Sequence, residues 1–263
     1  MIRLRPIGAV LTDAGQRSER FQAPWLQDLA GAWIFYTVLP AWPGVTPRFE
    51  RVARFAPLIG LVIGGLQWVC WLLLQQQGWA AWSCAAVVMT LGIWLSGGLH
   101  HDGLMDTADG LAAGTERRLQ AMDDSRVGAS GVLALAMVML IELAAMAELV
   151  PRVPMALLLT AFWARVSPLW AMARFPYLRD QGTAGFHRRH SRPGWDAVPM
   201  LLCLPLLAPV GWAWVPVGLV AAWLPAEWLG RRLGGHTGDS YGACVVVTQS
   251  LFVLVMAVCV SLA

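Results

Sequence analysis

The feature that most limits how this chain can fold is a series of apolar runs, each about as long as a membrane is thick. An α-helix needs about 20 consecutive apolar residues to cross the hydrocarbon core of a bilayer. Hydrophobic residues make up 57% of the chain and charged residues 13%, and the mean hydropathy of +0.57 is too high for a soluble domain. We therefore predict membrane-spanning helices over residues 55–74, 79–98, 129–149, 153–173 and 241–262.

Two other apolar stretches do not fit a single straight span. Residues 25–39 are too few, which predicts an interfacial or partly buried helix. Residues 197–229 are too many for one helix and are interrupted by Pro205, Pro209 and Gly211, which predicts a tight pair of helices.

Together these runs predict an all-α, polytopic integral membrane bundle of about six to seven transmembrane helices plus the N-terminal interfacial helix. A polar N-terminal segment, residues 1–24, precedes a single transmembrane catalytic domain, residues 25–263. Within the first span, Gly60, Gly64 and Gly65 should allow close contact with another helix.

The arginines predict the orientation. The chain has no lysine, and all but two of its 19 arginines lie on one side if the N-terminus shares that side with four polar connections. By the positive-inside rule that side is cytoplasmic. Guanidinium groups grip phosphate oxygens, so this side suits a phosphate-bearing substrate; the alternative is that the arginines only set orientation and bind anionic lipid. The four connections are residues 48–54, 99–127, 174–196 and 230–240.

Some charged residues fall within the apolar stretches themselves. Glu142, Arg165 and Glu227 are costly to leave in lipid, so they should face other helices, each other or the interface. A structural ion pair and a functional role are equally consistent with the sequence.

Three aspartates, Asp102, Asp106 and Asp109, form the main candidate for chemistry. If residues 102–109 are helical, this spacing places the carboxylates on one face over two turns. Their mutual repulsion is relieved by a cation between them, and hard oxygen ligands suit Mg²⁺ or Mn²⁺, which also take phosphate oxygens from a substrate. The alternative is a solvated acidic loop.

Two histidines directly precede the aspartates. Either could be a metal ligand, a proton carrier or an interfacial hydrogen-bonding residue. We favour a role for His100 and assign none to His101.

Two further polar segments are on the same predicted side. Asp124 and Arg126 could supply a metal contact and a phosphate grip, or Asp124 or Ser125 could cap a helix. Residues 231–240 resemble a glycine-rich phosphate loop in composition but lack the Gly-Lys-Ser/Thr of a P-loop.

These segments together resemble a known family, the cobalamin synthases, or adenosylcobinamide-GDP ribazoletransferases. The similarity extends over roughly residues 21–255, and the first aspartate block is its most specific part. The resembling blocks are residues 97–110, 122–128 and 232–239, with residues 35–40 and 57–60 in the N-terminal region.

The resemblance implies a Mg²⁺-dependent, multi-pass enzyme of the bacterial inner membrane. It would join adenosylcobinamide-GDP to α-ribazole, or to its 5′-phosphate, and release GMP. Its partners would be these substrates and the lipid bilayer, with no nucleic acid. A homo-oligomer is an open alternative, because the sequence does not determine the oligomeric state.

The implied site assigns a role to each candidate residue. Mg²⁺ would bind the substrate pyrophosphate, and His100 or Asp109 would accept the proton of the ribazole hydroxyl. The metal ligands are Asp102, Asp106, Asp109 and Asp124, and the substrate-binding residues are Arg126, Arg232, Thr237 and Asp239.

Two alternatives remain at this point. A CDP-alcohol phosphotransferase also uses a membrane aspartate cluster, but its pattern, with Ala-Arg soon after an Asp-Gly pair, is not matched after Asp102-Gly103. A cation transporter would use the aspartates as an ion path and would place them near the middle of the bilayer, whereas the sequence places them where a span ends.

Overall fold

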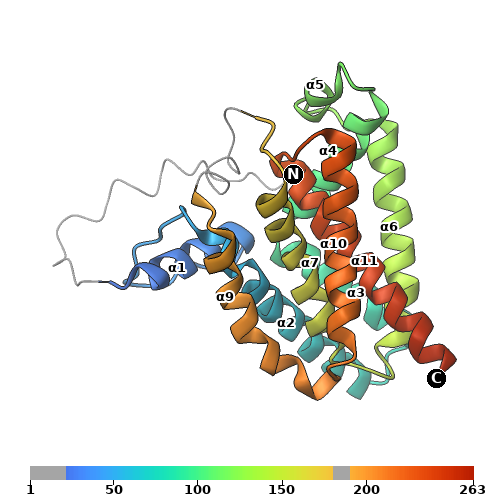
Figure 1. Ribbon diagram of the computed structural model, residues 1–263. Helices are drawn as coiled ribbons and strands as arrows, with labels where there is room; N and C mark the ends of the chain where they lie inside the picture. Colours follow the sequence, from blue (N-terminus) through green and yellow to red (C-terminus); the bar gives the residue numbers. More distant parts are fainter. Residues whose placement is uncertain (1–21, 180–189) are drawn as a thin grey trace.

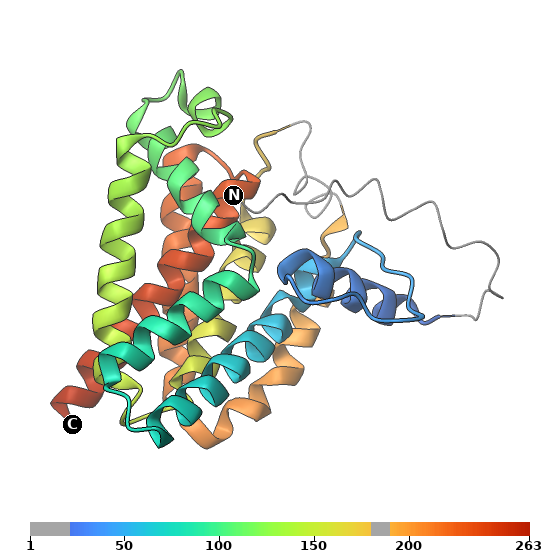
Figure 2. The ribbon, with the colours of Figure 1, turned by 180° about the vertical axis from the view of Figure 1, so that it is seen from behind.

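The computed structural model describes residues 22–179 and 190–263, and in these residues the chain is helical, without a β-strand (Figures 1 and 2). The predicted all-α class is confirmed. The elements are α1 (Pro24–Tyr36), the 3-10 helix η2 (Val52–Phe55), α2 (Ala56–Gln76), α3 (Ala81–Leu95), α4 (Leu99–Ala112), α5 (Arg118–Met122), α6 (Ala129–Leu149), α7 (Ala156–Arg174), α9 (Pro193–Cys203), the 3-10 helix η3 (Leu204–Val210), α10 (Trp214–Leu233) and α11 (Gly238–Leu262).

Four of the described helical segments are long and apolar enough to cross a membrane, and a fifth span results if α3 and α4 together form one. The predicted spans at 55–74, 129–149, 153–173 and 241–262 correspond to α2, α6, α7 and α11. The total of about six to seven spans stays a prediction.

The predicted span 79–98 ends earlier than expected, because the chain bends sharply after α3. Gly97 and Gly98 both have a positive φ, +63° and +74°, which is a backbone conformation that residues with a Cβ rarely adopt. The axis turns by 88° between α3 and α4. The aspartate-bearing segment is therefore a helix packed into the bundle against α11 and α6. The polar connection predicted over 99–127 begins only after α4, and it contains the short helix α5.

The apolar stretch 197–229 forms two helices, as predicted. The short α9 is followed by η3, which contains Pro205 and Pro209, and the chain reverses at Gly211 before α10. In Figure 1, α9 descends along the outside of the bundle and α10 returns through it.

Helix α1 lies to one side of the bundle and is held there by charge pairs (Figure 1). Asp28 on α1 is fully buried; its Oδ1 lies 2.6 Å from Nε of Arg48, and its Oδ2 lies 2.5 Å from Nη2 of Arg54. Because a buried carboxylate is stable only when paired, these arginines bind α1 to the segment that leads into α2. Trp25 at the start of α1 is exposed.

The predicted close helix contact through glycines is confirmed where α2 packs on α7. A Cβ on Gly60 would lie 2.4 Å from the carbonyl oxygen of Ala161, and one on Gly64 would lie 2.6 Å from that of Leu157. Gly65, in contrast, faces more open space, where the nearest atom to a Cβ would be 3.9 Å away.

These neighbouring glycines provide a matched stability test. Gly64→Ala should lower the free energy of unfolding by about 1–3 kcal/mol, because the added methyl group overlaps the backbone of α7. Gly65→Ala should leave it unchanged or raise it slightly. Thermal unfolding of the detergent-solubilised variants measures both, and equal melting temperatures would contradict the packing described.

Candidate active site

The two segments that carry the acidic residues meet where α4 crosses α11. A Cβ on Gly103 would lie only 2.5 Å from the carbonyl oxygen of Asp239, and one on Gly242 would lie 3.2 Å from Cα of His100. The two backbones therefore touch at Gly103, where only glycine leaves enough room, and pack tightly at Gly242. This crossing brings Asp102 of α4 next to Asp239 at the start of α11.

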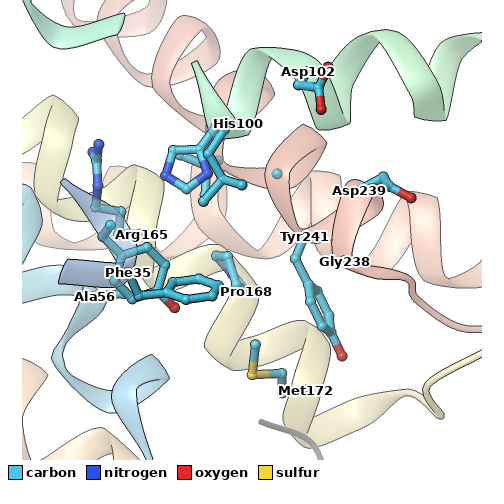
Figure 3. Close-up of a pocket in the computed structure, with 14 residues that line it drawn as sticks. Phe35, Ala56, His100, Asp102, Arg165, Pro168, Met172, Gly238, Asp239 and Tyr241 are labelled. Carbon is cyan, nitrogen blue, oxygen red and sulfur yellow. The ribbon is translucent and has the colours of Figure 1, made fainter. Parts of the chain in front are cut away.

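A cavity of about 100 Å³ opens beside this crossing. Figure 3 shows Asp102 and Asp239 on one side of it, His100 near the middle, and Arg165 with Phe35 on the other side. Its wall includes residues of α1, α4, α7 and α11, so the bundle as a whole shapes it. The polar or charged side chains that line it are Tyr36, His100, Asp102, Arg165, Asp239 and Tyr241.

Asp106 lies one helical turn after Asp102. Its charge interacts with those of Asp102, Asp109 and Asp239, and Arg179 supplies the opposite charge. Nη2 of Arg179 lies 2.9 Å from Oδ2 of Asp239. Sequence reasoning included Arg179 only as one of many loop arginines, because nothing along the chain indicates that it faces the aspartates.

Asp109, the third aspartate of the face, binds the start of another helix. Its Oδ2 accepts the backbone N–H of Gly128 at 2.7 Å, and its Oδ1 accepts that of Gly131 at 2.8 Å. Gly128 is the N-cap of α6 and has no side chain with which to cap the helix itself. The carboxylate of Asp109 therefore caps α6 from α4 and also opposes the positive end of its dipole. Its metal and proton-transfer roles stay predictions.

His100 is buried on the cavity wall, and its Nε2 has no hydrogen-bond partner among the described residues. A free ring nitrogen at a cavity can accept or donate a proton. His101 does not line this cavity.

The structure does not bring Asp124, Arg126 and Arg232 to the cavity wall. Asp124 and Arg126 pair with each other, with Nη2 and Oδ2 2.7 Å apart, on an exposed turn. Hydrogen bonds from the guanidinium and the backbone N–H of Arg126 lower the pKa of Asp124 to about 2. Arg232 is exposed at the end of α10. Their predicted contacts with metal and substrate are untested.

The glycine-rich segment before α11 is a compact turn held by its own side chains. Thr237 caps α11: its Oγ1 accepts the backbone N–H of Ser240 at 3.2 Å, and Oγ of Ser240 accepts the N–H of Thr237 at 2.8 Å. His236 is buried beneath the turn, where burial lowers its pKa to about 4. Gly234, at φ +82°, ends α10. This turn places Asp239 at the cavity.

The carboxylates can contribute to a Mg²⁺ site without forming a complete cage. Among the described residues, no group of three or more His, Cys, Asp or Glu side chains is arranged to hold a metal ion. Mg²⁺ commonly binds through one or two carboxylates together with substrate phosphate oxygens and water. Asp102 and Asp239 on one cavity wall, with Asp106 nearby, offer such a donor set.

Comparison with known proteins identifies the family. A family model described as cobalamin-5-phosphate synthase matches residues 28–257. The chain belongs to this family. The resemblance carried by the aspartate block is thereby confirmed, and no solved structure matches the chain.

Curated relatives in this family extend over nearly the whole chain. Two of them, from Prochlorococcus marinus strains MIT 9303 and MIT 9313, are each 59% identical over 251 residues, covering 89% of this chain and 96% of the relative. A relative from Thermosynechococcus vestitus is 39% identical, covering 88% and 96%. All three are named adenosylcobinamide-GDP ribazoletransferase; none is named a CDP-alcohol phosphotransferase or a transporter.

The helix cap formed by Asp109 can be tested by stability. Asp109→Ala should lower the free energy of unfolding by about 1–2 kcal/mol, because two N–H groups at the start of α6 lose their acceptor. Asp124→Ala serves as the control, since that carboxylate pairs only with an exposed arginine. Thermal melting of the purified variants makes the comparison, and a wild-type melting temperature for Asp109→Ala would show that Asp109 is not needed to cap α6.

Proposed function

We propose that this chain joins adenosylcobinamide-GDP to α-ribazole, or to α-ribazole 5′-phosphate, and releases GMP. The product is adenosylcobalamin or its 5′-phosphate. The observation that carries the proposal is that Asp102 of the aspartate block lines one cavity together with His100 and Asp239, while near full-length relatives are named for this transfer.

The reaction requires a site that binds a diphosphate and removes one proton. The oxygen of the ribazole hydroxyl forms a bond to the phosphorus attached to cobinamide, and the bond from that phosphorus to the bridging oxygen breaks, so that GMP leaves with the electron pair. Mg²⁺, when bound, supplies positive charge that polarises the phosphorus and neutralises the leaving phosphate.

The acidic side of the cavity holds the groups suited to that ion. Asp102 and Asp239 line the wall, and Asp106 lies close enough for its charge to interact with both. Arg179 balances part of this negative charge through its ion pair with Asp239. We assign to Asp102, Asp106 and Asp239 the role of holding the metal ion that binds the diphosphate.

Of the two candidate proton acceptors, His100 is the better placed. It lies on the cavity wall with Nε2 free of other partners, whereas both oxygens of Asp109 already accept backbone N–H groups of α6. We therefore assign to Nε2 of His100 the role of accepting the hydroxyl proton, and to Asp109 the role of capping α6.

We place the site on the cytoplasmic side of the bacterial inner membrane. In Figure 1 the α4–α5 segment and the turn between α10 and α11 lie at one end of the bundle, and the C-terminus lies at the other. The connections at the first end are the arginine-rich ones, and the positive-inside rule favours the cytoplasm for them.

The metal assignment predicts a specific loss of activity. Asp106→Asn removes a negative charge from the diphosphate site and should lower Mg²⁺-dependent GMP release by about a hundredfold or more. The protein should still insert in the membrane and elute as a folded species. Release of GMP from adenosylcobinamide-GDP and α-ribazole by purified protein is the assay.

Glu116→Gln is the matched control, because Glu116 is an exposed acid between α4 and α5. It should keep wild-type turnover. Wild-type turnover in Asp106→Asn would refute the role of the aspartate face, and GMP release unaffected by chelating Mg²⁺ would refute the metal.

A further inference from the structure

Arg165 is a buried cation on the cavity wall opposite the aspartates. It lies within α7, its exposed fraction is 3%, and α2 passes so closely that a Cβ on Gly60 would lie 3.0 Å from Cδ of Arg165. In Figure 3 its guanidinium is on the far side of His100 from Asp102 and Asp239. The same side chain also borders a second, small cavity that His100 and His101 line as well.

The hydrogen-bonding capacity of Arg165 is largely unused. Its Nη1 donates to the carbonyl oxygen of Ala161, 3.0 Å away on its own helix, and its Nε has no partner. Among the described residues no carboxylate lies within ion-pair distance of the guanidinium. Other buried or half-buried arginines of the structure, such as Arg51 and Arg54, do form such pairs.

Glu142 of α6, a buried acid whose charge interacts with that of Arg165, does not fill this role. Its Oε1 accepts from Nε2 of Gln249 at 2.5 Å, and its Oε2 accepts from Oγ of Ser250 at 3.1 Å. Both oxygens are thus engaged by α11. Glu142 and Arg165 influence each other at a distance, but they do not form the ion pair that the sequence allowed.

Burying an unpaired guanidinium inside a membrane protein costs free energy unless an anion pairs with it. The cavity determines how large that anion can be. At about 100 Å³ it is well below the roughly 300–1,000 Å³ of a pocket for a whole small-molecule ligand, so only part of a substrate enters. A phosphate group has the size and the paired oxygens that a guanidinium binds.

We propose that Arg165 binds a phosphate group of a substrate, at the opposite wall from the carboxylates that hold the reacting diphosphate. This inference rests on the proposed function. The phosphate has two sources, the 5′-phosphate of α-ribazole 5′-phosphate or the diphosphate of adenosylcobinamide-GDP. Arg165 thereby selects a phosphorylated substrate and positions it against His100.

The experiment measures kcat and KM for the wild type, Arg165→Gln and Arg165→Lys, with α-ribazole and with α-ribazole 5′-phosphate as acceptors. Arg165→Gln should raise the KM for the phosphate-bearing substrate about tenfold or more, the loss expected for a charged hydrogen bond. Arg165→Lys keeps the charge but loses the planar guanidinium with its paired donors. Its KM should therefore lie between the KM of the wild type and that of Arg165→Gln. Arg152→Gln, at an exposed arginine paired with Glu148, is the control and should resemble the wild type.

The two acceptors distinguish the sources. A KM that rises for α-ribazole 5′-phosphate and not for α-ribazole assigns Arg165 to the acceptor phosphate. A KM that rises for adenosylcobinamide-GDP with either acceptor assigns it to the donor. Unchanged KM values in Arg165→Gln, or a loss of kcat alone, would overturn the proposal. If Arg165→Gln does not fold, the same comparison is made with Arg165→Lys.

A binding measurement separates this inference from the proposed function. If the wild type releases no GMP, the proposed function fails, and titration with inorganic pyrophosphate then tests Arg165 alone. Weaker binding of pyrophosphate by Arg165→Lys than by the wild type supports a phosphate site. Equal affinities would overturn it.

Discussion

The site depends on the contact between the backbones of α4 and α11. Asp102 and Asp239 are far apart in the chain, and they line one cavity because Gly103 and Gly242 let the two helices touch. The bend at Gly97 and Gly98 directs α4 into this contact, and the capped turn at Thr237 starts α11 at the right point. Acidic side chains on a helix become a site only when a second helix supplies the opposite wall.

The placement of charge follows from the cost of burying it. Asp28 is fully buried and binds two arginines, Glu142 is buried and accepts two hydrogen bonds, and Asp109 accepts the two N–H groups that begin α6. These partners make the buried acids part of the scaffold. Arg165 differs because its partner is not among the described residues, and this difference is the reason for assigning it to a substrate.

Much of the fold could be predicted from the sequence, because hydrophobic length and glycine spacing are local signals. The spans at α2, α6, α7 and α11, the paired helices after residue 190 and a close helix contact at Gly64 all follow from them, although not that α7 is the partner. The bend before α4 was missed, since it results from the backbone conformation of Gly97 and Gly98, which the predicted span 79–98 placed at the end of a straight helix.

The site was predicted in part. The aspartate spacing correctly indicated one helical face, and the resemblance pointed to Asp239. The cap made by Asp109, the ion pair of Arg179 with Asp239 and the position of Arg165 depend on contacts between distant segments, which no local pattern contains. For the same reason Asp124 and Arg126, close to the aspartates in sequence, lie on an exposed turn away from the cavity.

The most direct test of this account is GMP release by Gly103→Ala, measured beside Gly194→Ala, in which the added methyl group meets nothing within 4 Å. In Gly103→Ala the added methyl group should push α4 away from the backbone of Asp239. The account predicts that turnover falls tenfold or more, since a displacement of about 1 Å can cost about a hundredfold in rate. The protein should remain helical and in the membrane. Gly194→Ala should keep wild-type turnover. Wild-type turnover in Gly103→Ala would contradict the claim that the α4–α11 contact forms the active site.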